Sequence, residues 1–121
     1  MKIAIDLDAT ITAYPNVFSS FSKAFKAAGH EIYIITDRIA GTEAVVSEML
    51  DELGIEYDFI KITKDKISYI LEQGIEALYD ETDEYFIGLA EDVAVFKVRG
   101  HYNFDFNDKK WIYSDKTGKK I

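Results

Sequence analysis

Short apolar runs alternate with longer amphipathic stretches along most of the chain. Three times an amphipathic stretch ends at a glycine, and an apolar run follows within a few residues. A glycine just past a helix end readily adopts the left-handed conformation that lets the chain turn back. The pattern therefore predicts three helices that end near Gly29, Gly54 and Gly74, each followed by a strand.

The amphipathic stretches have the three-to-four-residue spacing of helices, and the apolar runs are rich in Ile, Val and Tyr, as buried strands are. The apolar helical positions are Phe18, Phe21, Phe25 and Ala28, then Val46, Met49, Leu50 and Leu53, then Ile67, Ile70 and Leu71. The predicted strands are residues 2–6, 32–36, 58–62, 76–80 and 93–98, with a candidate short edge piece at 111–113. Strand–helix alternation requires crossover connections, so we expect an α/β fold: a three-layer α/β/α sandwich with a mostly parallel, five-stranded Rossmann-like sheet.

Length and composition limit the possible functions. The chain has 121 residues, 48% of them hydrophobic, which suits one domain spanning residues 1–121. It has no cysteine, which excludes disulfides, thiolate nucleophiles and iron–sulfur clusters. The net charge of −8 disfavours nucleic-acid and anionic-membrane partners. Since no apolar run approaches the roughly 20 residues that cross a bilayer, we expect a soluble, cytoplasmic protein.

Two acidic residues leave the first predicted strand, at Asp6 and Asp8. Ligands of open parallel sheets bind beyond the carboxyl ends of the strands, so residues at these exits are candidates for a site. Alternation in extended backbone points both carboxylates to the same side. A single Asp there is more often a turn cap. Two like charges side by side favour a cation site instead, because their repulsion needs compensation.

The next two candidates are a hydroxyl and a pair of lysines. Thr36 ends the second predicted strand, where a hydroxyl and free amides suit a phosphate oxygen, although a strand-end cap is equally compatible. Lys64 and Lys66 precede the apolar repeat of the third predicted helix. Lysine is disfavoured at a helix start, so one of them is a candidate anion ligand, with solvated loop lysines as the alternative.

The fourth strand exit is strongly acidic, with Asp80, Glu81, Asp83 and Glu84 within five residues. Such a run is usually a solvated helix start. If the first and fourth strands are neighbours, however, the run lies beside Asp6. Carboxylates without cysteine suit a hard divalent cation with oxygen ligands, Mg²⁺ before Ca²⁺ or Zn²⁺.

In this order, the motifs resemble those of the haloacid dehalogenase-like (HAD) phosphohydrolase superfamily. The matching residues are Asp6-Leu7-Asp8-Ala9-Thr10 after a hydrophobic strand, Thr36 at a strand end, Lys64 or Lys66 near a helix start, and Asp80-Glu81. The resemblance extends over residues 3–84, and it implies a HAD-like core as the fold.

The resemblance implies a Mg²⁺-dependent phosphatase that hydrolyses a phosphate monoester. Asp6 would be the nucleophile that forms an aspartyl-phosphate, and Asp8 the general acid and base. Mg²⁺ would be held by Asp6, the Asp8 carbonyl and Asp80, together with Glu81 or Glu84. Thr36 and Lys66, preferred over Lys64, would bind the other phosphoryl oxygens.

The chain departs from the family pattern in three respects. Ala9 replaces the usual glycine, and Glu81 replaces a second aspartate. The connections after Thr10 and before Lys66 are too short for a cap domain, so the substrate is bulky or another subunit covers the mouth. Four residues are candidates for lining that mouth, although surface-loop positions are the more common alternative for each: Tyr14, Arg38, His101 and Tyr102.

Two other functions are compatible with the sequence. The first is a metal-binding or scaffold protein that keeps the fold without activity, for which Ala9 and Glu81 give some reason. The second is a receiver-like phosphoacceptor domain, which the order of the Asp, Thr and Lys motifs disfavours. The expected partner is a phosphorylated small molecule or an exposed phosphoryl group on a larger one, and a homo-oligomer that covers the open site is conceivable. Fold analogy does not choose among these substrates.

Overall fold

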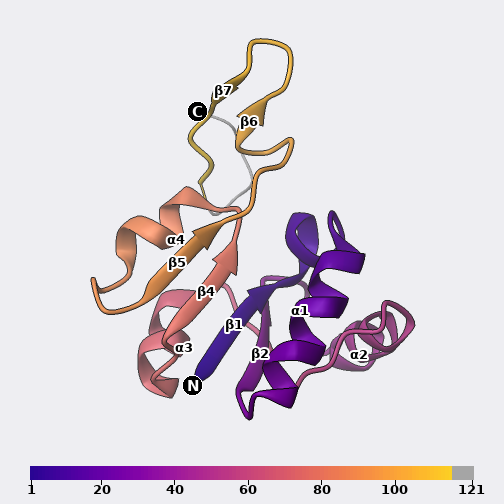
Figure 1. Ribbon diagram of the computed structural model, residues 1–121. Helices are drawn as coiled ribbons and strands as arrows, with labels where there is room; N and C mark the ends of the chain where they lie inside the picture. Colours follow the sequence, from indigo (N-terminus) through magenta and orange to yellow (C-terminus); the bar gives the residue numbers. More distant parts are fainter. Residues whose placement is uncertain (116–121) are drawn as a thin grey trace.

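A fully parallel sheet of five strands forms the centre of the protein in the computed structural model, which describes residues 1–115 (Figure 1). The strand order is β3-β2-β1-β4-β5. The strands are β1 (Lys2–Asp6), β2 (Glu31–Thr36), β3 (Phe59–Ile62), β4 (Ala77–Asp80) and β5 (Ala94–Lys97). All five predicted strands are confirmed to within one residue at each end. β1 and β2 could be predicted most easily, because they are almost completely buried and buried parallel strands consist of nearly continuous apolar residues.

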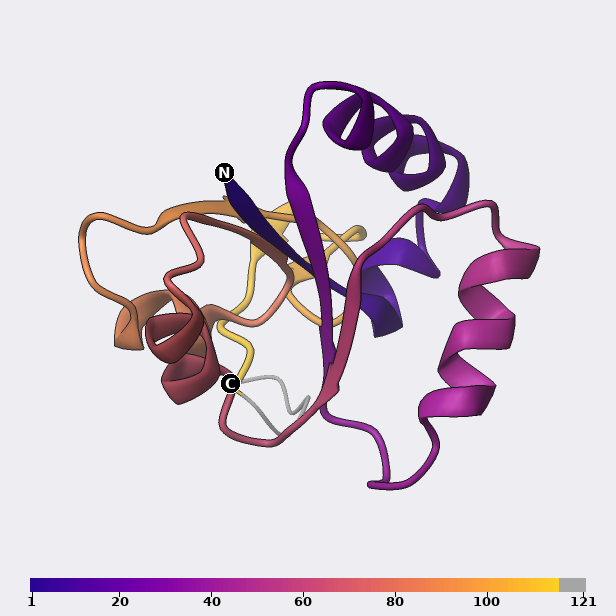
Figure 2. The same ribbon diagram turned by 90° about the horizontal axis from the view of Figure 1, so that it is seen from below.

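Four helices cover the two faces of the sheet, which confirms the three-layer α/β architecture (Figure 2). They are α1 (Pro15–Ala27), α2 (Glu43–Glu52), α3 (Lys66–Gln73) and α4 (Asp83–Gly88). Phe18, Val46 and Leu50 join α1 and α2 to one core cluster. Ile70 of α3 and Phe86 of α4 belong to the cluster on the opposite face. Successive residues of β1 and β2 alternate between these clusters, as strand geometry requires.

The predicted helix ends are confirmed by the backbone of three glycines. Gly29, Gly54 and Gly74 have φ angles of 87°, 71° and 67°. At Gly74, the amide hydrogen of the glycine donates to the carbonyl oxygen of Leu71, and the chain then reverses into β4. Three helical positions differ from the prediction: Leu71 is 54% exposed, Phe21 is 39% exposed and Ala28 is exposed.

Beyond β5, a small antiparallel hairpin of β6 (Phe104–Asp105) and β7 (Lys110–Trp111) forms a second sheet. It lies past the carboxyl end of β5 (Figure 1). The expectation of an edge strand at residues 111–113 is therefore corrected: Lys110 and Trp111 pair with β6, not with the main sheet. The chain leaves the sheet because Gly100–Asn103 forms a turn directly after Val98.

The β1–α1 connection contains one short irregular turn, Leu7–Ile11 (η1), before α1 begins. Within it, Asp8 is extended and Ala9 has a φ of 62° and a ψ of 4°. None of the helices among residues 1–115 is long and apolar enough to cross a membrane.

Candidate active site

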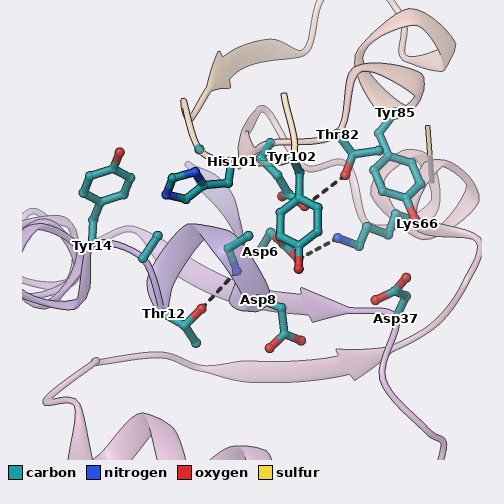
Figure 3. A pocket seen from close by; sticks show the side chains of 14 residues that line it. Asp6, Asp8, Thr12, Tyr14, Asp37, Lys66, Thr82, Tyr85, His101 and Tyr102 are labelled. Atoms are coloured by element: carbon teal, nitrogen blue, oxygen red, sulfur yellow. Dashed lines mark hydrogen bonds and ion pairs between the residues drawn. The ribbon is translucent and has the colours of Figure 1, made fainter. Parts of the chain in front are cut away.

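The carboxyl ends of β1, β2 and β4 meet at a pocket of about 710 Å³ (Figure 3). Parallel strands direct their carboxyl ends to one edge, and the crevice there is the usual ligand site of such sheets. The lining residues are Asp6, Asp8, Ala9, Thr12, Ala13, Tyr14, Asp37, Lys66, Glu81, Thr82, Tyr85, Gly100, His101 and Tyr102. Residues far apart in sequence therefore share one cavity.

Three carboxylates gather at the base of this pocket. One oxygen of each of Asp6, Asp80 and Glu81 lies within 4.8 Å of the others, close enough to hold one metal ion. Asp6 is 4% exposed and Asp80 is fully buried. The acidic run after β4 lies beside Asp6 because β1 and β4 are hydrogen-bonded neighbours, as the sequence interpretation required. Asp80 is oriented through Oδ1, which accepts from the amides of Glu81 and Thr82 at 2.7 and 3.1 Å.

Lys66 reaches the same cluster from the first turn of α3. Its Nζ lies 2.8 Å from Asp6 Oδ1 and 2.9 Å from Asp80 Oδ2, and its side chain is 3% exposed. Burial lowers the pKa of Lys66, but the attraction of the two carboxylates outweighs burial and leaves this pKa raised. The lysine is therefore fully protonated and compensates part of the negative charge.

The pKa values of Asp6 and Glu81 are raised, because Lys66 does not compensate all of the negative charge. Desolvation, followed by repulsion from Asp80, raises the pKa of Asp6 to about 6. Desolvation, followed by repulsion from Asp6 and Asp80, raises the pKa of Glu81 to about 10. Without a cation, Glu81 is thus protonated at neutral pH.

The hydrogen bonding of Thr10 agrees with a protonated Glu81. Thr10 Oγ1 lies 3.1 Å from Asp6 Oδ2 and 3.2 Å from Glu81 Oε2. A hydroxyl has a single proton and can donate to only one of these acceptors. Both contacts are hydrogen bonds when Thr10 donates to Asp6 and the carboxylic acid of Glu81 donates to Thr10.

Asp8 lies at the edge of the pocket, apart from the three clustered acids. Its carboxylate accepts from Arg38 Nε at 2.9 Å and from Arg38 Nη2 at 2.7 Å, and its side chain is 48% exposed. The buried Thr36 hydroxyl is 3.5 Å from Asp8 Oδ2. Arg38, considered for the mouth, instead forms a two-pronged ion pair with Asp8, and it is not among the residues that line the pocket.

The structure separates the alternatives that the sequence left open. Lys64 is exposed and borders a smaller cavity of about 420 Å³, together with Glu84 and Tyr85. Glu84 is not brought to the clustered carboxylates, because α4 begins at Asp83 and directs its first turn toward this second cavity. Of the two lysines, only Lys66 lies among the acids.

Asn103 supports the site, and sequence reasoning did not single it out. Its side chain is fully buried, and Nδ2 lies 3.0 Å from the Glu81 carbonyl and 2.9 Å from the Val98 carbonyl. Its Oδ1 accepts from the amide of Gly100 at 2.9 Å. Asn103 therefore connects the loop after β5 to the exit of β4. No periodicity marks such a residue, because its role depends on contacts between distant segments.

Comparison with known proteins gives a distant structural likeness. No family model matches the chain, and no curated protein matches it significantly. Solved structures described as the Pnkp1/Rnl/Hen1 RNA repair complex and the Pnkp1/Rnl/Hen1 complex contain similar chains, with TM-scores of 0.64 and 0.62. Each is 18% identical, and each match covers 80% of this chain but only 42% and 45% of those chains. This likeness shows the α/β fold, and the chain spans less than half the length of these neighbours.

Proposed function

We propose that the protein is a Mg²⁺-dependent phosphatase that hydrolyses a phosphate monoester through an aspartyl-phosphate. The observation that carries the proposal is the buried arrangement of Asp6, Asp80 and Glu81 around Lys66, at the carboxyl edge of the sheet. The HAD-like order of motifs, the α/β fold and the structural likeness to RNA repair components support it.

The donor set fits a hard divalent cation. Three carboxylate oxygens within 4.8 Å, with one ammonium group beside them, leave uncompensated negative charge in a buried place. Asp6, Asp80 and Glu81 would hold Mg²⁺, with the Asp8 carbonyl as a further oxygen donor. When bound, the ion neutralises charge on the carboxylates and on the phosphoryl oxygens.

Asp6 is the proposed nucleophile. Lys66 and Thr10 hold its two oxygens from different sides, which fixes the carboxylate in place. An Asp6 oxygen bonds to phosphorus while the ester P–O bond breaks, and the leaving oxygen takes a proton from Asp8. Water then attacks the phosphorus of the aspartyl-phosphate, Asp8 accepts the proton, and phosphate leaves as Asp6 is regenerated.

Lys66 and Thr36 are the proposed ligands of the non-bridging oxygens of the phosphoryl group. Positioning and charge neutralisation carry most of the catalysis in phosphoryl transfer, so buried groups of fixed direction suit this role. Both side chains are almost completely buried: Lys66 lines the pocket, and the Thr36 hydroxyl lies 3.5 Å from Asp8 Oδ2, beside the pocket rather than in its lining. Lys64 is exposed and borders the other cavity, so we assign it no role.

The test is phosphate release from p-nitrophenyl phosphate with and without Mg²⁺. We expect turnover that requires Mg²⁺ and falls by at least a thousandfold in Asp6→Asn, since that variant lacks the nucleophile. Asp51→Asn is the matched control, because Asp51 is exposed on the distant helix α2. Equal turnover in Asp6→Asn and the unmodified protein would exclude the aspartyl-phosphate mechanism.

One observation favours a second candidate, a metal-binding protein without turnover. The two-pronged ion pair with Arg38 occupies both oxygens of Asp8, so neither oxygen can contact a leaving group while the pair is intact. Calorimetric binding of Mg²⁺ without hydrolysis of any ester in a broad panel would support this candidate. A long-lived phosphorylated form after incubation with a small phosphodonor would instead indicate a receiver-like domain.

A further inference from the structure

The mouth of the pocket has a wall of aromatic side chains that the phosphoryl chemistry does not use. Tyr14, His101 and Tyr102 line the pocket together with the acidic base. In Figure 3, Tyr14 lies at the left of the pocket and His101 above it, the Tyr102 ring projects into the centre of the view, and Asp8 and Asp37 lie below. Tyr14 is 39% exposed and Tyr102 is 48% exposed, so their rings are accessible from solvent.

We propose that this wall is a subsite for a planar ring in the alcohol part of the substrate. The inference rests on the proposed function and specifies it further: the substrate is a small phosphate monoester that carries an aromatic ring, such as a nucleoside monophosphate or an aryl phosphate. The phosphoryl group occupies the acidic base near Lys66, and the ring stacks against Tyr102 and His101.

Two residues of the wall, Tyr14 and His101, are held in place by contacts that do not involve a ligand. The Tyr14 hydroxyl donates to the carbonyl of Arg99 at 2.7 Å, which joins the start of α1 to the loop after β5. The His101 ring packs on Phe106 of the hairpin connection, with ring centroids 5.0 Å apart. Asn103 holds the same loop through hydrogen bonds with the Gly100 amide and the Glu81 carbonyl. Because these contacts already hold Tyr14 and His101, these two residues lose little conformational entropy when a ligand binds beside them.

The size of the pocket also exceeds what a phosphate group needs. A cavity of about 710 Å³ lies in the range of sites that hold small organic ligands. Ala9 and Ala13 face the same space with single methyl groups, which leaves room beside the rings. The net charge of −8 disfavours a polynucleotide, because every phosphate of a polynucleotide adds to the repulsion. Ring stacking is compatible with different ring types, because each has an apolar face.

The experiment compares kcat/KM for two alkyl esters, a purine nucleoside 5′-monophosphate and glycerol 3-phosphate, with p-nitrophenyl phosphate as the aryl ester. The two alkyl esters have similar leaving groups, so their ratio reports the ring. We expect the unmodified protein to prefer the nucleotide at least tenfold, and the combined change Tyr102→Leu and His101→Leu to reduce this preference at least fivefold. Glycerol 3-phosphate turnover should fall less than nucleotide turnover, and the p-nitrophenyl arm shows whether an aryl ester shares the preference.

Two further variants separate stacking from other effects. Tyr102→Phe keeps the ring and should keep the preference, whereas a loss equal to that of Tyr102→Leu would mean that the hydroxyl is responsible and would overturn the proposal. Tyr113→Leu removes an exposed ring outside the pocket and is the matched control. Absence of any preference for the ring-bearing esters would also overturn it.

A binding measurement tests the subsite proposal separately from the phosphatase proposal. If no ester is hydrolysed, calorimetry of the nucleoside monophosphate and glycerol 3-phosphate against the unmodified protein still tests the wall. Tighter nucleotide binding that weakens in Tyr102→Leu would retain the subsite although the phosphatase proposal failed. Hydrolysis of both esters with no effect of Tyr102→Leu would retain the phosphatase and reject the subsite.

Discussion

At the scale of single residues, Lys66 balances the charge of the candidate site. Its ammonium group lies between two buried carboxylates, Asp6 and Asp80, which have few other cationic neighbours among residues 1–115. Buried charges are tolerated only when they are paired and hydrogen-bonded. The lysine is therefore expected to stabilise the fold independently of the catalytic role proposed for it.

We predict that Lys66→Met destabilises the metal-free protein by about 3–5 kcal/mol, because it leaves Asp6 and Asp80 buried without a counter-charge. Urea unfolding at pH 7 measures this change. Lys26→Met is the comparison, since the Lys26–Asp58 pair is more exposed and should contribute only about 1 kcal/mol. Equal losses in the two variants would contradict the importance of burial.

Ala9 gives a second prediction, which concerns the backbone. Its φ of 62° is unfavourable for a residue with a Cβ atom and costs roughly 1–2 kcal/mol. Ala9→Gly should therefore stabilise the fold by up to about 1 kcal/mol, after the greater unfolded-state entropy of glycine is subtracted. Thermal unfolding tests this. Ala24→Gly, at an exposed position inside α1, should have the opposite sign and cost about 1 kcal/mol.

At the scale of elements, the sequence was most informative where burial produces a pattern. The strands could be predicted because β1 and β2 are buried on both faces, and Asp6, Thr36 and Asp80 stood out because they end such strands. The direction of a side chain could not be predicted where it depends on a partner residue from a distant part of the sequence. The pairing of Asp8 with Arg38 belongs to this class, since it is a contact between two loops.

The hairpin shows the same limit for a whole element. Apolar residues at 111–113 indicated a strand but not its partner, because pairing depends on how the chain turns at Gly100–Asn103. The three hydrogen bonds of the buried Asn103 side chain determine that turn. Satisfied polar networks of this kind leave no periodic trace in a sequence.

We predict that Asn103→Asp destabilises the protein by about 2–4 kcal/mol. An aspartate can still accept from the Gly100 amide, but it cannot donate to the carbonyls of Glu81 and Val98, and it adds a buried charge. Asn107→Asp, at an exposed position of the hairpin, should change stability by less than about 0.5 kcal/mol. Chemical denaturation distinguishes the two, and a tolerated Asn103→Asp would mean that the loop is held by other contacts.

At the scale of the whole molecule, the clustered acids couple folding to pH and to cation binding. The pKa of Glu81 is raised from 4.5 to about 10 in the folded protein, so between these values the folded state holds a proton that the unfolded chain has released. Stability must then fall as pH rises through this window, by at most about 1.4 kcal/mol per pH unit for one proton. The raised pKa of Asp6, about 6, adds to the fall at the acidic end.

A bound divalent cation reverses this trend, because it favours the ionised carboxylates that the metal-free fold disfavours. We predict that the Tm of the metal-free protein decreases from pH 6 to pH 9, and that excess Mg²⁺ raises the Tm by several degrees more at pH 9 than at pH 6. Glu81→Gln should remove most of the pH dependence without Mg²⁺, since the uncharged amide replaces the proton-binding group, and it should also reduce the Mg²⁺ effect. Differential scanning calorimetry at the two pH values measures all three quantities. A Tm that rises toward pH 9 without metal, or a Mg²⁺ shift that Glu81→Gln leaves intact, would show that Glu81 is neither the proton-holding acid nor a ligand of the cation.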